Sequence, residues 1–343
     1  MIEASTSLPY FWAPGAGPDP RALQRLRALT RLPKQAVGEA WFMGEHRGRF
    51  FSLMHDDPRQ WPEMDLRTAL FEISSGISCF GPRHEWQLWC AFLLPRSLEL
   101  LDPALDAYSA RHLHPTLVTA TLMNLAQPAF PRLPPQVPRD LLDTLGRAMF
   151  ASSLWHAGRM REQAWCRPLR VGTIDGDTIQ PDQTFAASCT LALKLLEPTQ
   201  LQGWLASALA IDDPHWRAAW VVWLHAAAPM ILEGAYPDEL DPDESGEWNP
   251  HSARESSMAV WENSHTLKRE ACVRVPGQDA PSFIDPDNRH AFVAALRSLL
   301  GRGRLEQWAL ALSASQAYPG QLDYARRQYA VAARGALERY RLE

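Results

Sequence analysis

The chain has 343 residues, a net charge of −5, and 46% hydrophobic and 21% charged residues. This length and balance are typical of a soluble globular protein with one large or two ordinary domains, and the negative charge excludes nucleic-acid binding by bulk electrostatics. The longest apolar run, from Ala218 to Leu232, is interrupted by His225 and Pro229 and is too short to span a bilayer. We therefore expect no insertion into a membrane.

The cysteines are far apart and form no CxxC pair and no Cys/His ligand spacing: Cys79, Cys90, Cys166, Cys189 and Cys272. This pattern favours free, buried thiols in a reducing cytoplasm. The first residues lack the basic and apolar regions of a secretory signal. The chain also contains no Gly-x-Ser-x-Gly, P-loop or dinucleotide fingerprint, so we assign no catalytic residue and no cofactor.

The spacing of apolar residues predicts an almost entirely helical chain. Residues 1–18 are rich in Pro and Gly, and we expect an irregular arm held down by Tyr10, Phe11 and Trp12. A first helix is predicted from Asp19-Pro20, and further helices at Pro62–Cys79, His84–Leu101, Pro103–Ala110, Pro115–Ala126, Pro138–Trp155, Thr184–Leu196, Pro198–Ile211, Pro214–Glu233, Ser257–Ala271, Pro286–Gly301, Arg302–Ala317 and Pro319–Tyr340. Many begin at a proline, which the first helical turn tolerates.

A proline-rich stretch between Gln127 and Pro138 divides the chain into an N-terminal helical region, 1–130, and a C-terminal helical region, 139–343. The stretch is either a domain boundary or a stiff crossover, and we expect the two regions to pack as one continuous unit. The one strong β signal is 171–179, where β-branched residues flank Asp175-Gly176, a pair that suits a type I′ hairpin turn. The predicted fold is therefore all-α, an array of antiparallel helical hairpins, HEAT-like or irregular, with one small β-hairpin.

Two of the predicted helices share a sequence pattern. The segments that begin at Asp213 and Asp285 both contain Asp-Pro, Arg four residues on, then Ala, an aromatic residue, Val and Leu at matching offsets. Each predicts an Asp N-cap, Pro in the first turn and an apolar stripe. The pattern resembles the second helix of HEAT-like repeats, which stack helical hairpins into binding surfaces. The alternative is two independent capped helices.

Asp175-Gly176-Asp177 resembles an Asp-Gly-Asp segment of (α/α)-barrel glycoside hydrolases, in which an Asp serves in acid/base catalysis. A hairpin turn explains the same residues more simply. Three pairs have spacings that occur at metal sites: Glu262 with His265, His55 with Asp56, and His112 with His114. The first pair has no second copy, and the others fit a turn and two solvated rings, so we predict no metal site.

Trp216, Trp220 and Trp223 lie at i, i+4 and i+7 of one predicted helix. Such a stripe either lines a sugar-binding or lipid-binding cleft or forms the buried face of the helix. Phe292 and Ala295 occupy the offsets of the last two tryptophans in the matching helix, which favours the core.

Charge is distributed unevenly along the C-terminal half. From Glu233 to Glu247 the chain has seven acidic residues and no basic one, a long irregular loop that is either a solvated insertion or a docking surface for a basic partner. The candidate binding residues are Tyr236, Asp238, Glu239, Asp241, Asp243, Glu244, Glu247 and Trp248, with the two aromatic residues as anchors. From Arg289 to the end of the chain, nine Arg stand against four acidic residues, which makes these helices the other candidate face.

The helical segments Met64–Pro95, Trp216–Leu232 and Trp261–Trp308, together with the acidic loop, resemble bacterial immunity proteins of toxin systems. The resemblance implies a protein that binds and neutralises a cognate toxin. The acidic loop predicts that this partner is basic, the free cysteines predict a cytoplasmic location, and the lack of a catalytic signature predicts that the protein is not an enzyme. One alternative is an (α/α)-barrel glycoside hydrolase-like enzyme built on Trp and carboxylates. The other is a helical protein that binds a small molecule or a lipid.

Overall fold

A computed structural model describes residues 9–38, 48–74, 83–101, 107–125, 134–161, 164–166, 168–172, 178–237, 267, 282–314 and 322–342. The predicted fold class is confirmed: the described residues are mostly helical, with small antiparallel β-ladders. The α-helices are α1 Pro20–Ala28, α2 Glu63–Ser74, α3 Arg83–Ser97, α4 Ala107–Leu125, α5 Val137–Thr144, α6 Gln183–Leu195, α7 Pro198–Ala210, α8 Pro214–Ala226, α10 Pro286–Leu299, α11 Arg302–Ala314 and α12 Leu322–Tyr340.

Shorter elements connect these helices. The 3₁₀ turns are η2 Phe51–Leu53, η3 Pro58–Gln60, η4 Leu98–Leu101, η5 Leu145–Phe150 and η6 Ser152–Leu154, and η7 Pro229–Glu233 is a π-helical turn after α8. Strands β3 Leu169–Gly172 and β4 Thr178–Pro181 form the predicted hairpin, with Val171 opposite Ile179. The predicted turn at Asp175-Gly176 and, apart from Leu267, the predicted helix at 257–271 lie outside the described residues.

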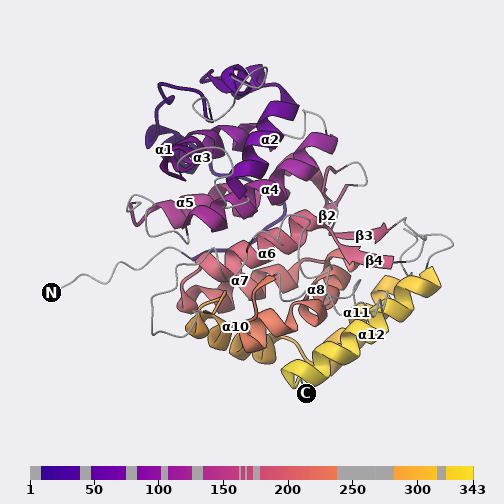
Figure 1. The fold of residues 1–343 in the computed structure, drawn as a ribbon. Coiled ribbons are helices and arrows are strands. Elements are labelled where there is room, and N and C mark those ends of the chain that lie inside the picture. The colour runs from indigo at the N-terminus through magenta and orange to yellow at the C-terminus, as the bar shows by residue number, and fades with distance from the viewer. Residues whose placement is uncertain are drawn as a thin grey trace, which may run out of the picture.

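Figure 1 shows α1 to α5 in the upper half of the molecule and α6 to α12 in the lower half, with α4 packed on α6 where the halves meet. Helix α5, which follows the proline-rich stretch, packs mainly against α1. In the lower half, α7 packs chiefly on α10 and α8 chiefly on α12, so the main partners are not neighbours in sequence. In a stack of repeats each unit contacts mainly its neighbours. The described helices therefore form an irregular array.

The two helices with a shared pattern begin as predicted. The Asp213 carboxylate accepts hydrogen bonds from the backbone N–H groups of His215 and Trp216, and Asp285 accepts one from Asp287. These bonds satisfy N–H groups that the first turn leaves without a helical partner. The caps fix where α8 and α10 start, while their different packing partners give them different roles in the fold.

The structure corrects two predicted boundaries. Helix α4 runs through Pro115, where the sequence predicts a new helix. A proline inside a helix costs roughly 3 kcal/mol, and here it is flanked by the fully buried His114, Leu117 and Val118, whose packing offsets that cost. Separately, no helix among the described residues is long and apolar enough to cross a membrane.

The second correction concerns the predicted helix Pro138–Trp155. Helix α5 ends at Thr144, and strands β1 Trp155–His156 and β2 Arg159–Met160 form a hairpin that the sequence analysis did not predict. Both turn residues, Ala157 and Gly158, have positive φ of 49° and 75°, as a type I′ turn requires. Of the two turn residues only Gly158 favours positive φ, since an alanine rarely adopts it, so the local sequence marks this turn weakly.

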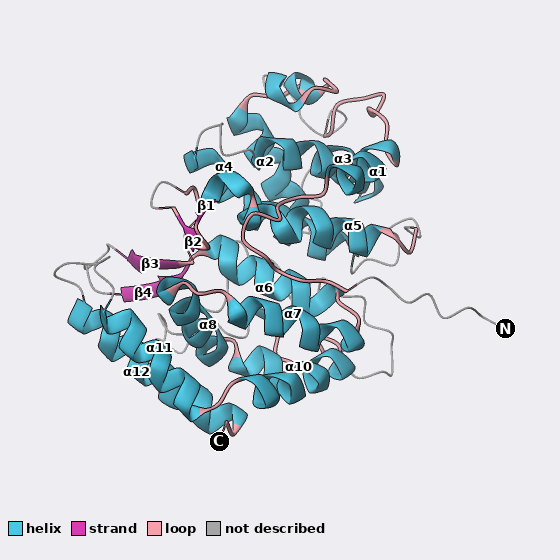
Figure 2. Ribbon diagram, turned by 180° about the vertical axis from the view of Figure 1, so that it is seen from behind, coloured by secondary structure: helices cyan, strands magenta, loops and turns pink. Residues whose placement is uncertain are grey.

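The core is one cluster of buried side chains that extends from Tyr10 to Leu342. The predicted packing of the N-terminal arm is confirmed for Tyr10 and Trp12, which are 1% and 2% exposed, whereas Phe11 is 48% exposed. The Trp12 ring lies 5.1 Å from that of Trp204, centroid to centroid. In the rear view of Figure 2 the arm passes as a loop between the two halves, so its aromatic residues join them.

A candidate docking groove between the last two helices

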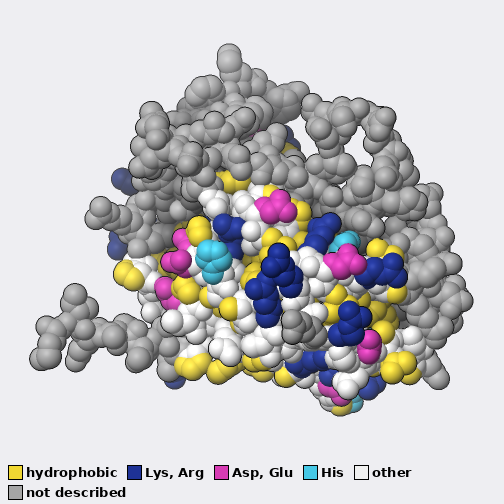
Figure 3. Space-filling model, turned by 90° about the horizontal axis from the view of Figure 1, so that it is seen from below, with side chains coloured by type: hydrophobic (Ala, Val, Ile, Leu, Met, Phe, Trp, Pro, Cys, Tyr) yellow, Lys and Arg dark blue, Asp and Glu magenta, His cyan; other side chains and the backbone are white. Residues whose placement is uncertain are grey.

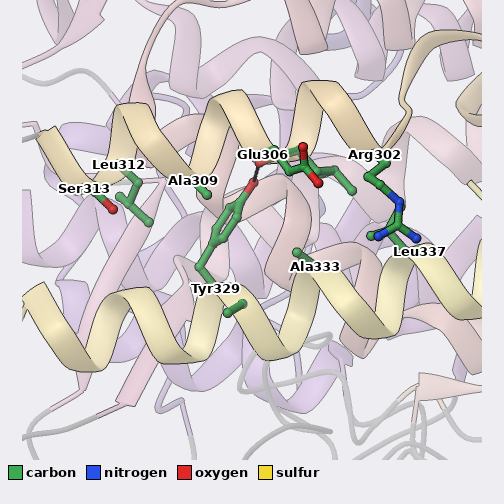
Figure 4. Close-up of a pocket in the computed structure, with 10 residues that line it drawn as sticks. Arg302, Glu306, Ala309, Leu312, Ser313, Tyr329, Ala333 and Leu337 are labelled. Atoms are coloured by element: carbon green, nitrogen blue, oxygen red, sulfur yellow. Dashed lines mark hydrogen bonds between the residues drawn. The ribbon is translucent and has the colours of Figure 1, made fainter. Parts of the chain in front are cut away.

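An apolar groove lies between the antiparallel helices α11 and α12 (Figure 4). Its volume is about 210 Å³. Its apolar lining consists of Leu305, Ala309 and Leu312 on α11 and Tyr329, Ala330, Ala333 and Leu337 on α12. Arg302 lies at one end and Ser313 at the other, with Glu306 between them. We refer to these residues as the α11–α12 groove.

Both helices that form the groove are held against α8. On α11, the Trp308 ring centroid lies 5.7 Å from the guanidinium carbon of Arg217 of α8 and 5.4 Å from that of Arg304. On α12, the Tyr340 hydroxyl donates a 2.9 Å hydrogen bond to the Leu224 carbonyl. Gly335 lets α12 approach α8 closely, because a Cβ there would lie 2.1 Å from Nδ1 of His225.

Tyr329 crosses the groove and ties its walls together. The Tyr329 hydroxyl donates a 2.9 Å hydrogen bond to the Leu305 carbonyl, and the residue is 3% exposed. Burial raises the pKa of this phenol above its usual value, so it stays a neutral donor at physiological pH. Ala309 on α11 and Ala333 on α12, which flank the Tyr329 ring, are small and half-buried, and their size leaves space between the helices.

Arginine surrounds this part of the molecule. The described side chains near the end of α10, the start of α11 and the end of α12 include Arg297, Arg302, Arg304, Arg334, Arg339 and Arg341, against Glu306 and Glu338. Figure 3, which views the molecule from below, shows Lys and Arg side chains gathered over the middle of this face. Burial lowers the pKa of Arg304, and the positive charge of Arg217 lowers it further.

Several of these arginines donate hydrogen bonds to backbone carbonyl groups. Nε of Arg297 donates to the Tyr340 carbonyl at 2.8 Å, and Arg304 donates to the carbonyls of Leu299 and Leu209. Arg302 and Arg334 are different: both are exposed, and neither is joined by a hydrogen bond or ion pair to any residue that the structure describes. Their charges are available to a ligand of the groove.

Exposed apolar side chains continue from the groove onto the outer surfaces of the same two helices. Leu310 on α11 is 71% exposed and Val331 on α12 is 49% exposed. Pockets that bury a small molecule usually measure about 300 to 1,000 Å³, and the groove, at about 210 Å³, is smaller. It has room for a few side chains of another protein.

The acidic candidate residues lie mostly outside the described part of the chain: Asp238, Glu239, Asp241, Asp243, Glu244, Glu247 and Trp248. Tyr236 is described, and it is 1% exposed, with its ring centroid 5.5 Å from that of Phe283. A ring that packs inside the protein has no surface to offer a partner. This corrects the expectation that Tyr236 anchors a partner.

The other candidate sites have structural explanations where they are described. The Asp56 carboxylate accepts hydrogen bonds from Arg96 and Arg27, and the bond from Arg96 holds its pKa below its usual value. His114 is fully buried, and its Nε2 lies 3.1 Å from the Leu145 carbonyl. The residues Asp175, Asp177, Glu262 and His265 lie outside the described residues. Within the described part of the chain, no group of three or more His, Cys, Asp or Glu is arranged to hold a metal ion.

The tryptophan stripe belongs to the core, as the matching helix predicts. Trp216, Trp220 and Trp223 are all 0% exposed. The Trp220 ring centroid lies 5.8 Å from that of Trp204, in an edge-to-face pair, a favourable geometry for aromatic rings. These rings therefore line no cleft for a sugar or lipid.

Sequence reasoning pointed to the Arg-rich end of the chain but did not identify the groove. Its apolar residues lie at helical spacing, Leu305, Ala309 and Leu312 on one helix and Tyr329, Ala333 and Leu337 on the other. Such stripes predict burial, and only the packed structure shows that part of each stripe stays uncovered. Comparison of the chain with family models, with curated proteins and with solved structures found no match.

Proposed function

We propose that the protein binds another protein and that the α11–α12 groove is part of its docking face. The observation that carries the proposal is an open, apolar groove of side-chain size between two helices that also expose Leu310 and Val331. Apolar pockets that receive a few partner side chains, surrounded by polar residues, provide most of the binding energy in protein interfaces.

A cognate toxin is the first partner to test. The motivation is the general resemblance of the helical segments to bacterial immunity proteins, whose action is to bind a toxin and requires no chemistry of their own. The acidic segment 233–248 supports a second contact, with a basic surface of the same partner, because seven carboxylates without a base focus negative potential.

The proposal is tested by co-purification with the product of the adjacent gene. Ala309→Trp fills the groove, and Gln307→Trp places the same ring at an exposed position of α11 that does not line the groove. We expect the partner to be recovered with the wild type and with Gln307→Trp, and lost with Ala309→Trp. Equal recovery with both variants would contradict a docking role for the groove.

The acidic segment is tested separately. We expect replacement of Asp238, Glu239, Asp241, Asp243 and Glu244 together by Ser to slow association and to flatten its dependence on salt, with the circular dichroism spectrum unchanged. Equal recovery of the partner at low and at physiological salt would show that this segment is a solvated insertion.

A further inference from the structure

We infer that the segment seated in the α11–α12 groove is a short amphipathic helix of the partner with carboxylates along its edge. This inference rests on the proposed function, because it names the chemistry of the partner at the docking face. Three observations support it: the length of the groove, the space left by its small residues and the charges near its edge.

The shape of the groove suits a helix. From Arg302 to Ser313 the lining of α11 covers eleven residue steps, which at a rise of 1.5 Å is about 17 Å, or roughly three helical turns. An amphipathic helix of that length presents apolar side chains at i, i+3 or i+4, and i+7, the spacing that enters grooves of this kind. Ala309 on α11 and Ala333 on α12 flank the Tyr329 ring, and their small side chains leave room above it for side chains of the partner (Figure 4).

The charges at the rim favour an acidic edge on that helix. Arg302 lies at the end of the groove, and Arg334 follows the groove residue Ala333 on α12. Neither guanidinium is paired within the described residues, and Glu306 is the one described carboxylate among the lining side chains. Exposed ion pairs add little to affinity, so the apolar lining provides most of it, and the arginines determine the orientation and the charge of the helix that binds.

Two peptides of about 15 residues, long enough to populate a helix, test this assignment. Both carry Leu at i, i+3, i+4 and i+7; one has Glu at the flanking positions and the other has Lys there. Binding of each fluorescein-labelled peptide to the full chain is measured by fluorescence anisotropy at low salt. We expect the Glu peptide to bind roughly tenfold more tightly than the Lys peptide, as two or three rim charges change sign.

Substitutions test the contribution of the apolar lining and that of the arginines separately. Ala309→Trp should weaken the Glu peptide by about thirtyfold, since it removes the space for a central anchor. Arg302→Glu should weaken it by roughly tenfold at low salt and less at high salt. The controls are Gln307→Trp on the same helix and Arg59→Glu, an exposed residue of η3 in the other half of the molecule. Both controls should bind like the wild type, and circular dichroism should show that all four variants are folded.

The outcomes distinguish the inference from the proposed function. Tight binding of the Lys peptide, abolished by Ala309→Trp, would overturn the acidic partner and leave the groove as a docking face. Absence of binding by either peptide up to millimolar concentration would overturn a helix in this groove, while co-purification still tests whether the protein has a partner. Displacement of the Glu peptide by single-stranded DNA, with no effect of Ala309→Trp, would overturn the inference in favour of a general anion-binding surface.

Discussion

Trp12 lies outside every helix and yet occupies the centre of the core. Its ring centroid is 5.2 Å from that of Phe150 and 5.8 Å from that of Trp216, its backbone N–H donates to Ser207, and its indole N–H donates to the Tyr10 hydroxyl. The Tyr10 hydroxyl in turn donates to the Leu142 carbonyl. These bonds satisfy the polar atoms that the aromatic residues bring into the core.

We predict that Trp12→Ala lowers the free energy of unfolding by about 3 to 5 kcal/mol, because it removes a fully packed aromatic ring from the core. Its neighbour Phe11 is 48% exposed, so Phe11→Ala should cost less than about 1 kcal/mol. Urea unfolding followed by circular dichroism measures both. Equal effects of the two substitutions would mean that the arm is not docked through Trp12.

His114 makes the fold sensitive to acid. Burial lowers its pKa from 6.5 to about 4, partly opposed by its contact with the Leu145 carbonyl and by the charge of Asp182. The unfolded chain therefore binds a proton more readily than the folded protein between these two values. The stabilisation is complete above pH 6.5 and is lost as the pH falls towards 4.

We expect this residue to account for a loss of about 3 kcal/mol of stability between pH 6.5 and pH 4. His114→Gln keeps a hydrogen-bond donor for the Leu145 carbonyl and does not titrate, so its free energy of unfolding should fall less steeply over that range. Urea unfolding at several pH values gives the two slopes. Parallel curves for the wild type and the variant would show that His114 is accessible to solvent.

At the scale of elements, the contact between α8 and α12 depends on a residue without a side chain. Gly335 lies on the α12 surface that faces His225 near the end of α8. Arg339, one turn further along α12, donates to the His225 carbonyl. This contact determines the position of α12 and therefore the width of the α11–α12 groove.

Gly335→Ala should destabilise the protein, although Ala is normally favoured over Gly in a helix by about 1 kcal/mol. The added methyl group would overlap the His225 ring, so one of the two helices must shift. Gly303→Ala, at a position of α11 with open space around its Cβ, is the matched control and should stabilise by up to about 1 kcal/mol. Stabilisation by Gly335→Ala would contradict the close packing of α12 on α8.

At the scale of the whole molecule, one continuous core encloses the described thiols. Cys90, Cys166 and Cys189 are buried and free, and burial raises the pKa of Cys90 to about 12 and those of the other two well above the usual value. A thiol that is neither accessible nor ionised does not react. These groups therefore report on global unfolding.

We predict that, without reductant, all five cysteines react with a thiol reagent in denaturant, as free thiols would. In the native protein at pH 8, at most two should react rapidly, since three are buried. The slow fraction should become reactive at the unfolding rate measured by circular dichroism. A count of one or three free thiols in denaturant would indicate a disulfide and contradict the predicted reducing compartment.

The sequence alone determined the features that depend on neighbours along the chain. Helix starts at Asp213 and Asp285 could be predicted because a capping carboxylate and a proline act within one turn. The all-helical class and the core position of Trp223 and Leu296 followed from apolar residues at helical spacing, and both side chains are 0% exposed. The aromatic residues of the arm were predicted to pack because of their apolar character, and Phe11, which is 48% exposed, is the exception.

Only the tertiary structure decided the features that depend on contacts between distant segments. Pro115 stays inside α4 because burial of its neighbours offsets the local cost of a proline, and no local pattern reports that balance. Tyr236 stands near the start of the acidic stretch Glu233–Glu247 and yet packs on Phe283, 47 residues away. The α11–α12 groove exists because two helices fixed on α8 leave part of their apolar stripes uncovered, and periodicity marks a stripe without stating how much of it the rest of the chain covers.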